Sequence, residues 1–303
     1  MKDLTQGSIA RHLLSLSIFI ALSMAFQTLY YLVDLYFVGR PGSAAIAAFV
    51  AVVAGVVMFW GYFLRPGNYL KLMPSRFRPQ PAVMWGMAKV GLPAGGEFAL
   101  MSVYMVLVYW IIRQFGAAAQ AGFGVGARLM QSMFLPVMAV AFAAVPLAGR
   151  NFGARRAGRV RATFRAALTL VSTVMLVVTV PSHVAPEGMI RIFSQDPAVI
   201  AFGAEYLKII SFNFLAVGVV FVCGSSFQGM GHTLPPLVCS CLRIFVFAIP
   251  AFLLSLRPGF QIREVWLLSV VTVTLQAALS YYLVRREFAR RLEFGDAAAA
   301  AAP

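Results

Sequence analysis

The sequence predicts an all-α integral membrane protein. Of its 303 residues, 61% are hydrophobic and 12% are charged, and the mean hydropathy is +0.83. Soluble domains average roughly 45–50% apolar and about 25% charged residues. The apolar residues also form long runs, and about 20 such residues in a helix are enough to cross a bilayer. We therefore expect a lipid bilayer to be the chief partner of this chain.

Eight apolar runs are candidate transmembrane helices. An even number of spans places both ends of the chain on the same side of the membrane. The runs cover residues 13–38, 44–64, 88–112, 120–148, 166–184, 199–227, 236–256 and 265–284.

Basic residues predict the orientation of these spans. With the N-terminus inside, about 17 Lys and Arg residues fall in cytoplasmic segments and about five fall outside, which is the bias of cytoplasmic loops near anionic lipid. We expect a multi-pass protein of the plasma (inner) membrane with both termini in the cytoplasm. The formal net charge of +15 follows from this topology, so a nucleic-acid partner is not expected.

Three segments interrupt the apolar pattern. Residues 65–81 combine prolines with basic residues and are predicted to be a cytoplasmic connector between two groups of helices. Residues 149–165 are basic and contain glycine, so we expect a loop or a short surface helix. The tail from Asp296 is alanine-rich and of low complexity.

Two acids lie inside apolar runs. Asp34 is the only charged residue between Leu13 and Val38, and Glu97 is the only one between Val90 and Ile112. An ionisable group inside a membrane is costly unless it faces a protein interior or a wet cavity, and by default it marks an ion, proton or substrate path. The alternative for each is a structural acid that is hydrogen-bonded to neighbouring helices.

Polar and soft side chains supply further candidates. Asn213 and Gln228 are candidates to hydrogen-bond a cargo molecule, although polar contacts between helices are the commoner role of such residues. Met101 and Met105 are one helical turn apart and suit an adaptable apolar cavity, although packing against lipid or core explains most such residues.

Two arginines are expected near the ends of their helices. Arg128 is a candidate for the substrate cavity because it could meet an acid in the interior, and Arg243 falls within or near a span. Snorkelling to the lipid headgroups is the alternative for both.

The sequence contains no pattern of a metal site or an enzyme. Cys223, Cys239 and Cys241 have no metal-ligand spacing with the three histidines and are expected to pack as free thiols. No span carries a nucleophile–base pair or an H-E-x-x-H pattern, so neither an enzyme nor an organic cofactor is expected.

A weak internal repeat connects two helix starts. Residues 42–49 (GSAAIAAF) resemble residues 116–123 (GAAAQAGF), and each copy follows a span that contains an acid. Two spans separate the copies, so both have the same orientation. Parallel repeats of this kind occur in some transporters.

Four motifs, in order along the chain, resemble the MATE (multidrug and toxic compound extrusion) family. Asp34–Gly42 (DLYFVGRPG) resembles the end of that family's first helix and Val90–Glu97 (VGLPAGGE) the start of its seventh. Gly149–Ala154 (GRNFGA) resembles the loop after the eighth helix, and Phe227–Thr233 (FQGMGHT) the end of the tenth.

The resemblance implies twelve helices in two six-helix lobes around a central cavity. It also implies export of drugs or other organic compounds, chiefly cations, in exchange for H⁺ or Na⁺. Asp34 and Glu97 match acids that couple transport to the cation in parts of the family. In the branch that uses the acid of the seventh helix, the tenth helix tends to carry an aspartate, whereas this chain has Asn213 there.

This chain also departs from the family plan, because its repeat returns after two helices instead of six. About four helices of the N-terminal lobe are therefore expected to be missing. The expected organisation is a remnant of the N-terminal lobe over residues 1–64, a connector over 65–87, a complete six-helix lobe over 88–287 and a tail over 288–303. Two alternatives to an antiporter remain open, which are a membrane remnant that transports nothing and a related flippase for lipid-linked oligosaccharides.

Overall fold

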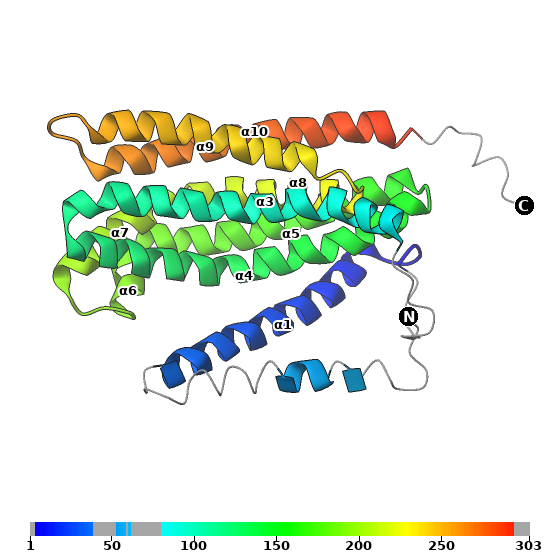
Figure 1. Cartoon of the computed structure of the whole chain (residues 1–303), viewed down its shortest axis with the longest axis horizontal. Helices are drawn as coiled ribbons and strands as arrows, with labels where there is room; N and C mark the ends of the chain where they lie inside the picture. Colours follow the sequence, from blue (N-terminus) through cyan, green and yellow to red (C-terminus); the bar gives the residue numbers. More distant parts are fainter. Residues whose placement is uncertain (1–3, 39–52, 59, 62–79, 294–303) are drawn as a thin grey trace, which may run out of the picture. The chain divides into compact units, whose positions relative to one another are not determined.

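The computed structural model describes residues 4–38, 53–58, 60, 61 and 80–293, and for residues 28–38 it describes the backbone alone. Every regular element named in this part of the chain is helical. The helices are α1 (Ile9–Val38), α3 (Pro81–Ile112), the short 3-10 helix η2 (Arg113–Phe115), α4 (Ala117–Gly153), α5 (Ala157–Val184), α6 (Pro186–Arg191), α7 (Pro197–Ile210), α8 (Asn213–Gly229), α9 (Leu234–Ser255) and α10 (Ile262–Arg291) (Figure 1).

Among the described residues, six helices are long and apolar enough to cross a membrane, and there are seven such spans if the bent pair α7 and α8 counts as one. The spans predicted over residues 13–38, 88–112, 120–148, 166–184, 199–227, 236–256 and 265–284 each correspond to one of these. The span predicted over 44–64 lies largely outside the described residues. The predicted all-α membrane fold is confirmed.

The chain divides into two compact units. One unit contains Met1–Ile20 together with Ala88–Pro303, and the other contains Ala21–Met87. The first unit holds α4 to α10, most of α3 and the beginning of α1. Within it, α4 is the central helix, since it packs against α5, α7 and α8, while α10 packs against α8 and α9.

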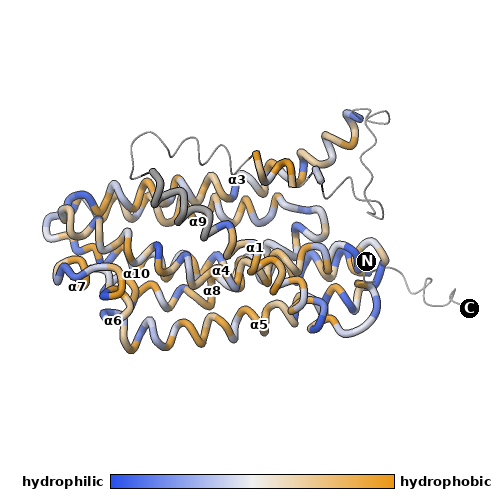
Figure 2. Tube along the Cα trace, turned by 90° about the horizontal axis from the view of Figure 1, so that it is seen from below, coloured by the Kyte–Doolittle hydropathy of each residue, from blue (hydrophilic) through white to orange (hydrophobic). Residues whose placement is uncertain are grey.

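The distribution of hydropathy along the helices fits a bilayer. Hydrophilic residues gather at the two ends of the bundle, while the middle parts of the helices are hydrophobic (Figure 2). Large apolar side chains such as Leu176, Phe245 and Leu275 are exposed on α5, α9 and α10. In a membrane protein these side chains contact lipid tails, which are as apolar as the side chains themselves.

One predicted span is not a single straight helix. The run over residues 199–227 forms α7 and α8, whose axes differ by 56°. The break lies at Ser211 and Phe212, and the hydroxyl of Ser211 donates to the carbonyl of Lys208 (2.8 Å). Broken helices place backbone and side-chain polar groups at membrane depth, where transporters commonly bind their ligands.

The segment over residues 149–165 is not the predicted loop or short surface helix. Helix α4 continues to Gly153 and α5 begins at Ala157, so that only Ala154, Arg155 and Arg156 form the turn. Arg155 makes this sharp reversal with a φ of 55°. Alanine and arginine are strong helix formers, and they outweigh the glycines of this segment.

At this turn, the N-terminal segment is bound through its main chain. The Arg159 guanidinium donates to the carbonyls of Leu4 (3.3 Å) and Gly7 (3.0 Å), and its Nε donates to Asn151 Oδ1 (3.0 Å). Asn151 is fully buried and donates to the carbonyls of Leu147 (2.8 Å) and Leu4 (3.4 Å). These contacts fix the start of the chain to the corner between α4 and α5.

Arg159→Met is therefore expected to release residues 4–8 from this corner. Loss of the charge-assisted hydrogen bonds should speed exchange of the backbone amides in this segment by roughly tenfold. Hydrogen exchange followed by mass spectrometry, on peptides that cover residues 4–12, measures the effect. Arg161→Met is the matched control because Arg161 is exposed on the same helix, and equal exchange in the two variants would contradict the role of Arg159.

Helix α4 also contacts its neighbours through glycine at both ends. A Cβ added at Gly122 would lie 2.9 Å from the carbonyl oxygen of Val199, and one at Gly203 would lie 3.1 Å from that of Gly122. At the other end, a Cβ at Gly149 would lie 3.0 Å from the carbonyl oxygen of Gly229. Small residues allow this close approach of helix backbones in membranes.

Candidate functional site

Glu97 lies near the middle of α3, sixteen residues from its first residue and fifteen from its last. It is half-buried, and the Ser240 hydroxyl on α9 donates to its Oε1 (3.0 Å). Gln276 on α10 in turn donates its amide to the Ser240 oxygen (3.1 Å). The predicted intramembrane acid is therefore held by a chain of hydrogen bonds that crosses three helices.

A narrow crevice opens beside this carboxylate. Its walls come from α3, α8, α9 and α10. They consist of Glu97, Val220, Cys223, Gly224, Phe227, Pro236 and Ser280. Pro93, one turn before Glu97, has no N–H and so leaves one backbone carbonyl of α3 without its usual helical partner.

Arg243 is the second charged group in this region, and its predicted place near a helix end is wrong. It lies nine residues from the start of α9 and twelve from its end. Its guanidinium carbon is 4.8 Å from the centre of the Tyr104 ring, a cation–π contact. Arg243 and Glu97 interact electrostatically, but no direct ion pair joins them within the described chain.

Tyr104 connects this arginine to Asn213. The Tyr104 hydroxyl lies 3.2 Å from Ser269 Oγ on α10, and the amide of Asn213 donates to the same oxygen (3.4 Å). Asn213 is buried at the first position of α8, beside the break between α7 and α8. Its Oδ1 and the Nε of Arg243 are buried atoms without a hydrogen-bond partner in the described residues.

The structure thus places two of the predicted site residues, Glu97 and Asn213, in two hydrogen-bonded groups on α3, α8, α9 and α10, one running through Ser240 to Gln276 and the other through Ser269 to Tyr104. We call these two groups the polar array. Arg243 belongs to this array as well, and the principle that singles out intramembrane acids applies to it equally. Sequence reasoning missed the other uncharged members, because polar side chains of this kind are common within membrane helices. Those members are Tyr104, Ser240, Ser269 and Gln276.

The remaining predicted residues lie elsewhere. Arg128 is exposed on α4, eleven residues from the first residue of that helix, so its predicted place near a helix end is wrong as well. Gln228 is half-buried near the end of α8. Met101 is 49% exposed, whereas Met105 is half-buried against the core. Asp34 lies on α1, in the part of that helix whose side chains are outside the described set.

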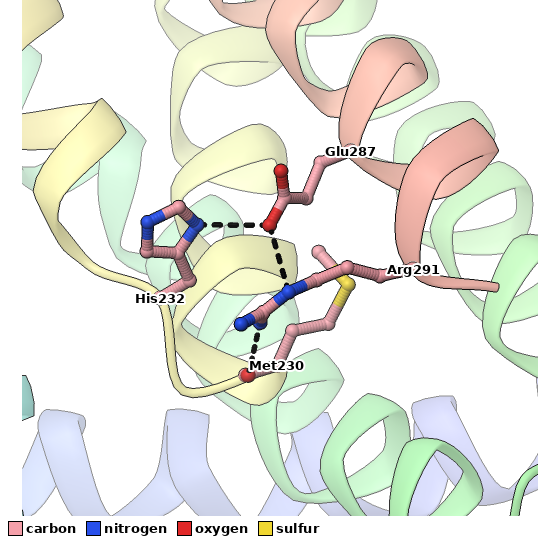
Figure 3. Close-up of polar contacts among 4 residues, drawn as sticks. All are labelled: Met230, His232, Glu287 and Arg291. Atoms are coloured by element: carbon pink, nitrogen blue, oxygen red, sulfur yellow. Dashed lines mark hydrogen bonds and ion pairs between the residues drawn. The ribbon is translucent and has the colours of Figure 1, made fainter.

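A separate polar cluster lies where α8 turns into α9. The buried Glu287 on α10 accepts from His232 Nδ1 (2.9 Å) and pairs with Arg291 Nε (3.1 Å) (Figure 3). Arg291 also donates to the carbonyl of Met230 (3.2 Å). Thr233, which follows His232 in the turn, donates to a carbonyl of α3 (2.9 Å). The members of this cluster satisfy one another, so the cluster joins the turn to α10 and α3.

No group of three or more His, Cys, Asp or Glu side chains that could hold a metal ion occurs among the described residues. The three cysteines are free, and two of them are buried in α8 and α9. The polar array offers a ligand one carboxylate, one guanidinium and several neutral hydrogen-bonding groups.

The sequence of this chain is similar to those of known multidrug resistance and export proteins. YpnP of Bacillus subtilis, which is described as a probable multidrug resistance protein, is 30% identical to this chain over 215 residues. These residues are 70% of this chain and 47% of YpnP. The multidrug export protein MepA of Staphylococcus haemolyticus is 27% identical over 63% of this chain and 42% of its own length. The chain spans about half the length of the curated relatives that it matches.

Solved structures give the same architecture. A MOP superfamily transporter from Pyrococcus furiosus superposes with a TM-score of 0.76 at 17% identity, over 83% of this chain and 57% of that one. An outward-facing multidrug resistance MATE family transporter superposes with a TM-score of 0.76 at 18% identity, with the same coverage. These relatives are described as transport or resistance proteins and not as enzymes. The family model MatE matches residues 93–253, more than half of the chain, and the chain therefore belongs to the MatE family.

Proposed function

We propose that this chain acts in secondary antiport, exporting drugs or other organic compounds in exchange for H⁺ or Na⁺. The observation that carries the proposal is Glu97, a half-buried carboxylate near the middle of a membrane-spanning helix that is held by Ser240 in a MATE-like fold. The relatives described as multidrug export proteins support organic compounds as the cargo class.

In this proposal, the cargo and the coupling ion compete for one carboxylate, that of Glu97. The ionised form of Glu97 attracts a cationic group of the cargo, whereas a bound proton or sodium ion neutralises it and removes that attraction. Because the two ligands favour different states of the same group, loading one promotes release of the other. The half-buried position inside a membrane-spanning helix strengthens this competition, since charges interact more strongly in a low dielectric.

The basic residues support an orientation for this transporter. The end of the bundle that carries the α4–α5 turn also carries Arg150, Arg155 and Arg156, and the end of α10 contributes Arg285 and Arg290. We place this end in the cytoplasm of a cell with an energised plasma membrane, in keeping with the positive-inside rule.

Reconstitution of the purified chain into proteoliposomes tests the proposal. Transport of one cationic dye, ethidium, and one zwitterionic dye is expected when a proton or sodium gradient is imposed, and none when an ionophore collapses that gradient. Comparison of the two gradients identifies the coupling ion. Transport that ignores both gradients would contradict coupling to an ion, whereas no transport at all would favour a lobe that inserts in the membrane and moves nothing.

A further inference from the structure

We propose that Arg243 is a specificity-determining residue that binds an anionic group of the cargo. The polar array then accepts an organic zwitterion, with one cationic and one carboxylate group, in preference to a simple cation. The inference deepens the proposed function and rests on it because it concerns the same site, but it is a statement about binding and can be tested without transport.

The guanidinium of Arg243 packs against an aromatic ring but forms no hydrogen bond to the described residues. The face of Tyr104 supports it at 4.8 Å, yet it makes no hydrogen bond to any described residue, and its buried Nε has no partner. Guanidinium carries five N–H donors in a fork that matches a carboxylate in two parallel hydrogen bonds. A buried donor without a partner is costly, so a ligand carboxylate would supply what the protein leaves unfilled.

Glu97 does not supply the hydrogen-bond partner that the Arg243 guanidinium lacks. Its Oε1 accepts from Ser240, and no ion pair within the described residues joins it to Arg243, although the two groups interact electrostatically. When Glu97 is ionised, the two groups carry one negative and one positive charge. A simple cation near Glu97 is repelled by Arg243, whereas a zwitterion places its cationic end near Glu97 and its carboxylate near the guanidinium.

The position of Arg243 along α9 argues against a lipid headgroup as the source of the anion. At a rise of 1.5 Å per residue, the nine residues before it place it about 14 Å from the nearer end of α9. That is roughly half the thickness of a hydrocarbon core of about 30 Å. An anion at this depth has to be carried there by a ligand that enters the protein.

Asn213 offers a complementary group without a partner in the same array. Asn213 donates to Ser269, which lies beside the hydroxyl of Tyr104, and its Oδ1 has no partner in the described residues. The polar array therefore contains a buried acceptor at Asn213 and a buried donor at Arg243 that have no partner among the described residues. Unpaired buried polar groups are costly, and a polar ligand would supply the partners that these two groups lack.

A matched pair of dyes tests the inference. Rhodamine B is a zwitterion at neutral pH, and its ethyl ester is a cation with the same ring system. Binding to the full chain in lipid nanodiscs, measured by fluorescence anisotropy against empty nanodiscs, should be about tenfold tighter for rhodamine B, as a charge-assisted hydrogen bond implies. Arg243→Met should remove this preference, while Arg243→Lys, which keeps the charge without the fork, should retain part of it.

The controls separate this inference from the proposed function. Arg257→Met makes the same chemical change at an exposed position in the turn after α9, and it should keep the wild-type preference. Equal affinity for the two dyes in the wild type, no binding of either, or a preference that survives Arg243→Met would overturn the inference. Glu97→Gln should weaken both dyes alike, and failure of that result would count against the role of Glu97 while leaving the assignment of Arg243 in place.

Discussion

Glu97→Gln is expected to lower gradient-driven efflux by the reconstituted chain at least about tenfold, the loss that follows when a charged partner is removed from a ligand. The substitution keeps the size of the side chain, and the amide oxygen of glutamine can still accept from Ser240 as Glu97 does (3.0 Å). What disappears is the negative charge and the ability to bind and release a proton. Initial rates of dye transport in proteoliposomes, normalised to the amount of folded protein, measure the effect.

Glu205→Gln is the matched control for this experiment. Glu205 is an exposed acid on α7, so its replacement should leave efflux unchanged. Asp34→Asn is the parallel test of the predicted acid on α1. If both Glu97→Gln and Asp34→Asn transport at the wild-type rate, neither acid couples transport to a cation.

The membrane spans could be predicted because hydropathy alone decides them. A run such as residues 236–256 has no alternative to crossing a bilayer, and α9 covers almost the same residues. Helix ends are less well determined, because charged residues can continue a helix beyond the lipid. Arg159 and Arg161 illustrate this, since both belong to α5 although their basic, glycine-containing segment predicts a loop or short surface helix.

The candidate site could be predicted only in part, because hydrogen bonds between helices depend on their relative rotation and depth. Glu97 is evident in the sequence as an isolated acid. Its partner Ser240 lies 143 residues further along the chain, and Gln276, which donates to Ser240, lies 179 residues further, so no local pattern connects them. The unpaired state of Arg243 likewise depends on what other helices fail to offer, which only a three-dimensional arrangement can show.

Gly229→Ala is expected to destabilise the bundle by about 1–3 kcal/mol, the usual cost of overpacking a well-packed contact. The new Cβ would lie 2.9 Å from the carbonyl oxygen of Val145, 3.0 Å from the Cβ of Ala148 and 3.3 Å from the backbone nitrogen of Gly149. None of these atoms belongs to a flexible side chain, so α4 and α8 have to move apart. A thermal scan in detergent, followed by size-exclusion chromatography, should show a midpoint lower by several degrees.

Gly224→Ala separates crowding from the general effect of replacing glycine in a helix. Gly224 lies five residues earlier on α8, and a Cβ there would meet nothing within 4 Å. Alanine should therefore stabilise this position by up to about 1 kcal/mol through its better helix propensity. If Gly229→Ala were as stable as Gly224→Ala, the close contact between α4 and α8 would not exist in the membrane protein.

The double variant Gly149→Ala with Gly229→Ala tests whether these two glycines are in direct contact. The two glycines face each other, and a Cβ at Gly149 would lie 3.0 Å from the carbonyl oxygen of Gly229. Once the first substitution has separated the helices, the second has less left to disturb. The combined loss in stability should therefore be smaller than the sum of the single losses, as expected for residues in direct contact, whereas strict additivity would mean that the two positions act independently.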